Sequence, residues 1–228
     1  MTSKRAAIYH FTDGLRLKSI CDNEIARIKE YAASKGYDDV DVFCDVRTSR
    51  EEHEVLDELI QKRNQYSAVF ARDYFHYNKY ILKVKEMLRM FDEDDIHVYT
   101  KDDLPLSFSS NAPFSENLNV ISYCCHWTKH SDPNDLKLKN DILRHFVKNE
   151  TNWNLLTQIS EEERKGHAGI QPGLSHLLEM KDSYHIILVD SISSIHWRTH
   201  NFCEKRGLLE KDIFSLREGF IKFERNQV

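Results

Sequence analysis

The stretch Tyr-His-Ile-Ile-Leu-Val at residues 184–189 contains the most apolar run of the chain. The run Ala-Val-Phe-Ala at 68–71, 118 residues before 186–189, is its equivalent in the first half. Short apolar runs of this kind are typical of strands buried in a parallel sheet. On either side of each run, strand-like segments alternate with segments whose apolar residues recur every three to four positions, which is typical of amphipathic helices. This alternation predicts an α/β fold with mostly parallel sheets flanked by helices.

The same order of elements is expected in both halves of the chain. In the first half we predict strands at 6–9, 40–44, 68–71 and 96–99, and helices at 18–35, 51–61 and 80–91. In the second half we predict strands at 120–123, 155–157, 186–189 and 213–216, and helices at 136–148, 173–180 and 197–206, the last ending before Gly207. Equivalent strands are 114 to 118 residues apart, which indicates a tandem duplication of one α/β unit.

The segment 104–119 has a different composition from its surroundings. It holds two of the four prolines and breaks every helical or strand period, as linkers do. We therefore expect one domain at 1–103, a linker at 104–119 and a second domain at 120–228.

Bulk composition limits the classes of function. With 12 Phe, 10 Tyr and 3 Trp the chain can build packed cores, and its net charge of -5 does not favour strong nucleic-acid binding. The chain has five cysteines, an odd number that cannot all be paired in disulfides within the chain, which favours free thiols in a reducing compartment. Apolar runs are too short for a signal peptide or a membrane helix, so we expect a cytoplasmic protein with no membrane partner.

Five stretches match the framework of one known family: 6–9, 30–46 and 66–79 in the first half, and 171–178 and 184–197 in the second. They resemble the catalytic domain of serine recombinases, the resolvase and invertase family. The resemblance implies two resolvase-like domains. It covers nearly all of both halves, mostly through their hydrophobic framework.

The family's chemistry requires a serine nucleophile after the first strand and several arginines that bind the scissile phosphate. The equivalent positions hold Phe11, Asp13, His76 and Lys79 in the first half and Cys125, Trp127, Ser194 and Trp197 in the second. Thr12 offers a hydroxyl one residue away, and Gln171 replaces a further arginine. The resemblance therefore implies degenerate copies with no catalytic residues and no cofactor.

Two further groups of residues are candidates for function. Cys125, His126, His196 and His200 are expected at the carboxyl end of the second sheet, with His196, His200 and Cys203 on one helix face. They form a candidate metal site or Cys-His nucleophile, although their spacing matches no strong zinc signature. In the first half, Tyr74, Phe75 and Tyr77 are candidates for a protein interface.

Three functions remain open at this level. The first is a catalytically inactive, recombinase-like protein that acts through protein contacts and regulates an active recombinase or another mobile-element process. The second is an enzyme with repurposed His/Cys or metal chemistry, and the third is a weak DNA-binding protein. Because the family's long dimerisation helix and DNA-binding domain are not found in the sequence, we also expect the two copies to form an intramolecular pseudodimer.

Overall fold

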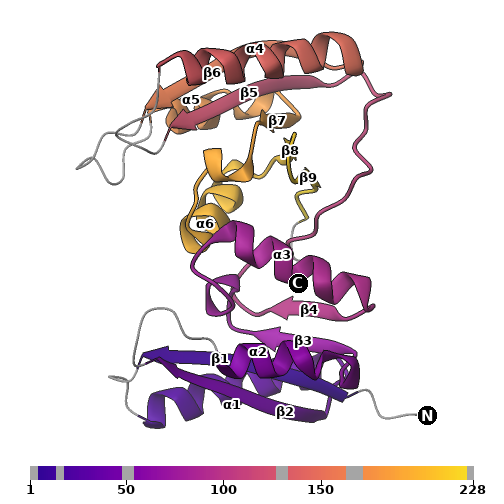
Figure 1. The fold of residues 1–228 in the computed structure, drawn as a ribbon, viewed down its shortest axis with the longest axis vertical. Coiled ribbons are helices and arrows are strands. Elements are labelled where there is room, and N and C mark those ends of the chain that lie inside the picture. The colour runs from indigo at the N-terminus through magenta and orange to yellow at the C-terminus, as the bar shows by residue number, and fades with distance from the viewer. Residues whose placement is uncertain (1–4, 14–17, 48–53, 127–132, 163–171, 225–228) are drawn as a thin grey trace. The chain divides into compact units, whose positions relative to one another are not determined.

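The computed structural model describes residues 5–13, 18–47, 54–126, 133–162 and 172–224. The chain divides into two compact units, Met1–Pro105 and Leu106–Val228. Each unit is a twisted sheet with helices on both faces (Figure 1). The predicted α/β class, with mostly parallel sheets in two tandem units, is confirmed.

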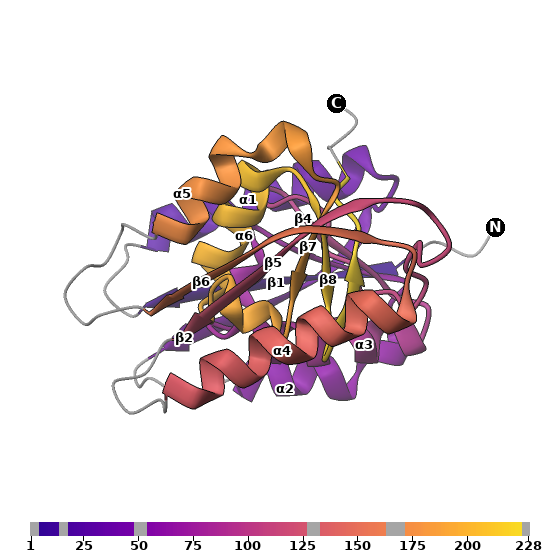
Figure 2. The same ribbon diagram turned by 90° about the horizontal axis from the view of Figure 1, so that it is seen from above.

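The first unit has four parallel strands in the order β2-β1-β3-β4. Its strands are β1 (Arg5–Asp13), β2 (Asp39–Arg47), β3 (Ala68–Ala71) and β4 (His97–Thr100), and its α-helices are α1 (Lys18–Ser34), α2 (Glu54–Gln61) and α3 (Ile81–Glu93). Two single-turn 3-10 helices, η1 (Arg63–Gln65) and η2 (Tyr74–His76), precede and follow β3. Helix α1 covers one face of the sheet, and α2 and α3 cover the other (Figures 1 and 2).

The second unit has the same order of strands and one more strand, β6-β5-β7-β8-β9. Its strands are β5 (Asn119–His126), β6 (Asn154–Glu162), β7 (Ile186–Val189), β8 (Asp212–Ser215) and β9 (Gly219–Ile221). Its helices are α4 (Pro133–Glu150), α5 (Pro172–Glu179), α6 (Thr199–Leu209) and the 3-10 turns η3 (Lys181–Ser183) and η4 (Ile192–Ser194). Figure 2 shows α4 on one face and α5 and α6 on the other.

Glycine ends the first helix as its position in the sequence predicts. Gly36 has a φ of 84°, its N–H donates to the carbonyl of Ala33 over 2.9 Å, and the N–H of Tyr37 donates to Ala32 over 3.0 Å. This pair of bonds is the Schellman motif, which satisfies carbonyls that the helix end leaves without partners. The turn directs Tyr37 into the core and leads the chain into β2.

Two features of the second unit differ from expectation. Helix α6 does not end before Gly207 but continues to Leu209, where Glu210 takes the left-handed conformation with a φ of 49°. A single glycine costs a helix only about 1 kcal/mol relative to alanine, less than Phe202 and Leu209 contribute by their burial on this helix. The antiparallel strand β9 was not predicted, because three residues carry too little periodicity.

The segment expected as a linker packs onto the second unit. Phe114 contacts the rings of Trp153 and Phe214 at centroid distances of 5.3 and 5.2 Å, and Ser109 forms an antiparallel bridge with Phe220. The indole N–H of Trp153 donates to the carbonyl of Pro113 over 3.0 Å. These contacts attach residues 109–114 to the core of the second unit.

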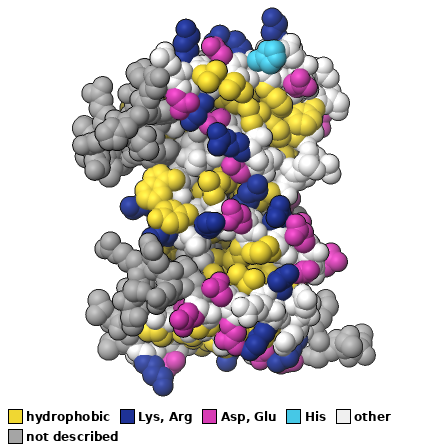
Figure 3. Space-filling view, viewed as in Figure 1, with side chains coloured by type: hydrophobic (Ala, Val, Ile, Leu, Met, Phe, Trp, Pro, Cys, Tyr) yellow, Lys and Arg dark blue, Asp and Glu magenta, His cyan; other side chains and the backbone are white. Residues whose placement is uncertain are grey.

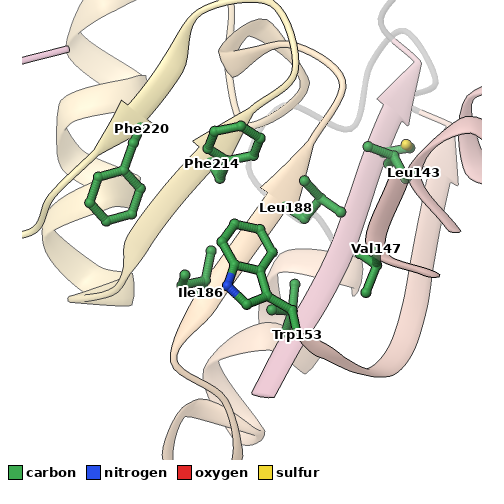
Figure 4. Packing of buried hydrophobic residues seen from close by; sticks show 9 residues of the cluster. Leu143, Val147, Trp153, Ile186, Leu188, Phe214 and Phe220 are labelled. Atoms are coloured by element: carbon green, nitrogen blue, oxygen red, sulfur yellow. The ribbon is translucent and has the colours of Figure 1, made fainter. Parts of the chain in front are cut away.

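The core beneath α4 is built from strands and helix together. Leu143 and Val147 of α4 meet Ile186 and Leu188 of β7, and Trp153 lies beside them (Figure 4). The equivalent core in the first unit joins Ile8, Ile28, Ala32, Tyr37 and Phe70 beneath α1. Each large side chain buried here stabilises the fold by about 1.5–3 kcal/mol.

Among the described residues no helix is long and apolar enough to cross a membrane.

Candidate functional site at the carboxyl ends of the strands

A carboxylate at the carboxyl end of the first sheet ties three elements together. The hydroxyl of Tyr9 on β1 donates to Oδ2 of Asp45 on β2 over 2.8 Å. The same carboxylate accepts the backbone N–H groups of Val55 and Leu56, at the start of α2, over 3.3 and 3.2 Å. The Asp45 carboxylate therefore caps the N-terminus of α2, where the first N–H groups of the helix lack backbone partners and the helix dipole favours an anion.

The second unit repeats this arrangement with a longer acid. Tyr123 on β5 donates its hydroxyl to Glu161 on β6, and the N–H of Gly173 at the start of α5 donates to the same carboxylate over 2.6 Å. Burial, the neighbouring Cys125 and the bond to Glu161 together raise the pKa of Tyr123 far above its usual value, so the phenol remains a donor. Both units thus place their own carboxylate at a helix N-terminus.

A second carboxylate in each unit holds the turn that follows the third strand. Asp103, after β4, accepts the N–H of Tyr74 at the start of η2 over 2.7 Å. Glu218, after β8, accepts the N–H of Ile192 at the start of η4 over 2.9 Å. The turns that carry two of the expected family positions are therefore fixed by acidic side chains.

An ion pair joins the first helix of each unit to the residue after the third strand, with the signs reversed between units. In the first unit the Arg72 guanidinium lies 2.9 Å from the carboxylate of Glu24 on α1. In the second unit Lys139 on α4 lies 3.4 Å from Asp190. The sequence offsets are 115 residues for Glu24 to Lys139 and 118 for Arg72 to Asp190. The position is therefore ionic in both units although neither residue type is retained.

The ion pair of the first unit extends into a buried network with two imidazoles. Arg72 also donates to Asp73 over 2.9 Å, and Nδ1 of His76 lies 2.8 Å from the other oxygen of Asp73. His10 is fully buried on β1, with Nε2 3.5 Å from Glu24 and its ring centroid 5.3 Å from that of His76. These five side chains form one polar cluster at this end of the first sheet.

Electrostatics keep the Asp73 carboxylate ionised. Burial would raise its pKa, but the hydrogen bonds and charges of His76 and Arg72 outweigh burial and lower it to about 2. A carboxylate that orients an imidazole is a common arrangement for proton transfer. His76 is only 2% exposed and His10 is not exposed at all. Because both imidazoles are closed to solvent, the network has a structural role in this conformation.

The equivalent cluster of the second unit has different chemistry. Asp190 accepts the hydroxyl of Ser194 over 2.5 Å and holds Lys139 on its other oxygen. The buried Cys124 takes the place of His10 on the first strand. Burial and the charge of Asp190 raise the pKa of this thiol to about 12, so it is not a nucleophile near neutral pH.

In the first unit, some of the residues at the positions of the family's catalytic residues lie close together. Phe11 on β1 packs against His76 and Phe75 with ring centroids 5.3 and 5.8 Å apart. Lys79 lies beyond η2, with its Nζ 4.8 Å above the ring of Tyr80. Asp13 is the last residue of β1. Phe11 and His76 therefore lie together, as a shared site would require, while Lys79 contacts its neighbour in sequence.

In the second unit, Cys125 is buried on β5 and Ser194 is buried in η4. Trp197 follows η4 and carries the Arg198 guanidinium 4.7 Å from the centre of its indole ring. Trp127 and Gln171 lie outside the described residues.

The candidate metal ligands are not arranged as expected. Helix α6 begins at Thr199, so His196 precedes it and does not share a helix face with the exposed His200 and with Cys203, contrary to prediction. Nδ1 of His196 accepts the N–H of Arg198 over 2.9 Å. Burial and the charges of Lys205 and Arg198 lower the pKa of His196 to about 4. His126 ends β5, and in the part of the chain that the structure describes, no three His, Cys, Asp or Glu side chains converge as a metal ion requires.

Two of the three candidate interface aromatics are interior residues. Tyr77 is fully buried and stacks on Tyr9 at a centroid distance of 5.7 Å, and Tyr74 is 1% exposed. Only Phe75 keeps part of its surface open to solvent. From the sequence, this cluster could pack beneath a turn or form an interface, with the interface favoured. The buried Tyr74 and Tyr77 pack beneath the turn.

Sequence reasoning missed the acidic and basic residues that organise this region. These are Glu24, Asp45, Asp73 and Asp103 in the first unit and Lys139, Glu161, Asp190 and Glu218 in the second. One signal was present: an acidic residue stands two places after the buried Phe43 and again two places after the buried Ile159. An acidic residue near the end of a strand is common, however. These two stand out only because they occupy equivalent positions in the two halves.

No known family profile matches the chain, and no curated protein matches it. Among solved structures, the C-terminal catalytic domain of ISC1926 TnpA, an IS607-like serine recombinase, has a TM-score of 0.39 and 18% identity, over 42% of this chain and 70% of that chain. LsrB from Clostridium saccharobutylicum in complex with AI-2 has a TM-score of 0.30 and 10% identity, over 93% of this chain and 70% of that chain. A Caulobacter myo-inositol binding protein has a TM-score of 0.31 and 11% identity, over 94% of this chain and 75% of that chain. The chain thus has weak structural similarity to a serine recombinase domain, and its similarity to solute-binding proteins is of the same low level.

Proposed function

We propose that this chain is a serine-recombinase-like protein that has lost DNA strand-transfer chemistry and acts through protein contacts in recombination or another mobile-element process. The observation that carries the proposal is the set of carboxylates at the carboxyl ends of both sheets. A scissile phosphate would have to enter a region that already holds Asp45, Asp73 and Asp103 in the first unit, and Glu161, Asp190 and Glu218 in the second.

The helix N-termini at this edge support the proposal. A phosphate bound at a helix N-terminus accepts backbone N–H groups, as the P-loop and dinucleotide-binding folds illustrate. At α2 and α5 those N–H groups donate to Asp45 and Glu161. A phosphate that used these N–H groups would therefore have to displace an anionic side chain.

Two cations at this edge, Arg72 and Lys139, are also engaged by acids. Arg72 contacts Glu24 and Asp73, and Lys139 contacts Asp135 and Asp190. Two unit charges of like sign 4 Å apart repel by about 4 kcal/mol at an effective dielectric constant near 20, which would work against a phosphate beside these carboxylates. The arrangement favours a structural role for both cations.

The remaining hydroxyl candidate is also poorly placed for attack. Thr12 is 6% exposed and accepts the thiol of Cys21 over 3.3 Å. A nucleophilic hydroxyl needs a base to take its proton and open access to phosphorus. Burial under α1 restricts that access.

Incubation with supercoiled plasmid tests the chemical half of the proposal. The protein should neither nick the plasmid nor leave protein covalently attached to DNA after denaturation with detergent. An intact serine recombinase with its own site serves as the positive control. An adduct formed by the wild-type chain and lost in Thr12→Ala would show that the protein is an active recombinase.

Salt-dependent binding to duplex DNA tests the DNA-binding alternative. Each phosphate neutralised by Lys or Arg contributes a slope of about -0.9 to the plot of log affinity against log salt. We expect binding near the detection limit and a shallow slope. A steep slope with tight binding would favour a DNA-binding function instead.

A further inference from the structure

We infer that the exposed face of α4 is a self-association surface, at which two copies of this chain pair with their α4 helices antiparallel and centred on Ile142. This inference rests on the proposed function, since it names the surface and the partner of one protein contact. It concerns the side of α4 that faces away from the core of the second unit.

The outer face of α4 carries apolar side chains that the unit does not bury. Leu138 is 58% exposed and Ile142 is 46% exposed, while Leu143 and Val147 on the opposite face are buried in the core. Leu138, Ile142 and Phe146 are four residues apart, so they form one stripe along the helix. The stripe runs from the exposed Leu138 to the half-buried Phe146, whose ring also stacks on Phe214 at the edge of the core, 5.4 Å between centroids. Figure 3 shows apolar side chains among charged ones over the part of the second unit that carries α4.

An open groove of about 600 Å³ lies beside this stripe. It is lined by Asp141, Ile142, His145, Phe146, Glu150 and Leu216. Such a groove gives an apolar side chain from another molecule a place to insert. Leu138 of a second copy is such a side chain.

The stripe is self-complementary when read in opposite directions. In an antiparallel pair centred on Ile142, a residue that lies n positions before Ile142 faces the residue n positions after it in the second copy. Leu138 then faces Phe146, Asp135 faces Asn149, and Asn134 faces Glu150. Ile142 faces its own counterpart on the twofold axis. Leu138 and Phe146 are apolar, and the carboxylates of Asp135 and Glu150 meet the side-chain amides of Asn149 and Asn134. Each amide has two N–H donors, so Asn149 can bind a carboxylate as well as its neighbour His145.

Charge also distinguishes antiparallel from parallel pairing. A parallel pair in register would place Asp135, Asp141 and Glu150 each beside its own counterpart, and like charges directly opposite one another destabilise an interface. The antiparallel arrangement separates the two copies of Asp135 by 14 helical positions, or about 21 Å along the axis. Two copies are therefore expected to choose the antiparallel orientation.

Disulfide trapping in a chain of residues 1–228 tests both the surface and its orientation. Three single-cysteine additions are made, Ile142→Cys, Asp135→Cys and Asn149→Cys, and each is oxidised with oxidised glutathione, which takes the two thiol hydrogens and is reduced to two glutathione thiols. We expect a crosslinked dimer of Ile142→Cys alone, and of Asp135→Cys mixed with Asn149→Cys. Asp135→Cys and Asn149→Cys should each fail to crosslink by themselves. Wild-type protein measures the background from the partly exposed Cys44 and Cys203.

Sedimentation without crosslinking provides the second readout. Wild-type protein should shift from the 27.0 kDa monomer toward a dimer as its concentration rises. Ile142→Glu should weaken the dimer about tenfold or more, because it brings two charges together on the axis. Leu208→Glu is the matched control, since Leu208 is 54% exposed on α6 and outside the stripe.

Three results would overturn the inference: a wild-type chain that stays monomeric at every concentration, crosslinking of Asp135→Cys with itself, or a dimer that Ile142→Glu leaves unchanged. A monomer that also leaves DNA intact rejects this surface and keeps the proposed function. A dimer that forms a covalent adduct with DNA rejects the proposed function and keeps the surface.

Discussion

The Tyr9 hydroxyl donates a hydrogen bond of 2.8 Å to Oδ2 of Asp45, and through that carboxylate the first strand of the unit is tied to the start of α2. Tyr123 and Glu161 form the same relationship in the second unit, with Gly173 at the start of α5. In both units the tyrosine pairs in register with a residue two places before the acid, Phe43 or Ile159.

Removing the Tyr9 hydroxyl should destabilise the first unit. Tyr9→Phe leaves the buried Asp45 carboxylate with one donor fewer, so the free energy of unfolding should fall by about 1–2 kcal/mol. Denaturant unfolding measures the loss, and hydrogen exchange of the β1 and β2 amides localises it. Tyr31→Phe, at a half-buried ring packed on Phe70, is the matched control. Equal losses in both variants would mean that the Tyr9–Asp45 bond contributes nothing specific.

The ion pair between Glu24 and Arg72 should show coupling in a double-mutant cycle. Glu24→Gln and Arg72→Gln should each destabilise the unit, because the side chains are only 18% and 31% exposed and each leaves a charge without this partner. The double variant should cost less than the sum of the two, with an interaction energy of about 1–2 kcal/mol. Strict additivity would indicate that the pair is electrostatically silent. Arg89 and Glu93, an exposed pair on α3, provide a control cycle expected near 0.5 kcal/mol or less.

Asp73 should make the first unit less stable in acid. Its pKa falls from 3.8 in the unfolded chain to about 2 in the fold, so the unfolded state takes up its proton first as the pH decreases. The stability gained from its ionisation is present above pH 3.8 and lost as the pH falls toward 2, a change of about 2 kcal/mol. Asp73→Asn should flatten the stability profile in this window. A profile unchanged by Asp73→Asn would contradict the assignment.

Two glycines of the second unit should respond to alanine with opposite signs. A Cβ at Gly173 would lie 2.8 Å from Ile159 Cγ2 and 2.9 Å from the Glu161 carboxylate, so Gly173→Ala should destabilise by about 1–3 kcal/mol. A Cβ at Gly207 meets nothing within 4 Å, and this residue lies inside α6, so Gly207→Ala should stabilise by about 0.5–1 kcal/mol. Thermal unfolding of the two variants measures both effects. Destabilisation by Gly207→Ala would mean that the helix end depends on this glycine after all.

The spacing of apolar residues predicted most of the helices and strands, because the buried face of each element requires apolar residues at that element's own period. The strands at 68–71 and 186–189 agree with the sequence to the residue, and the end of α1 follows from Gly36. The polar site was predicted less well. Phe11 and His76 do meet, but His196 lies outside the helix assigned to it, and the buried Tyr77 was expected on a surface.

The sequence by itself determined the alternation of strands and helices and the similar order of the two halves, because apolar periodicity is a local property of the chain. Only the tertiary structure decided which polar groups meet. Asp45 joins Tyr9 across 36 residues, and Arg72 joins Glu24 across 48, distances over which no periodic signal persists. Parallel strands connected by helices bring such residues to one edge of the sheet, and burial there requires each charge to find a partner. The reversed signs of the Glu24–Arg72 and Lys139–Asp190 pairs follow from that requirement, since either order of charges satisfies it.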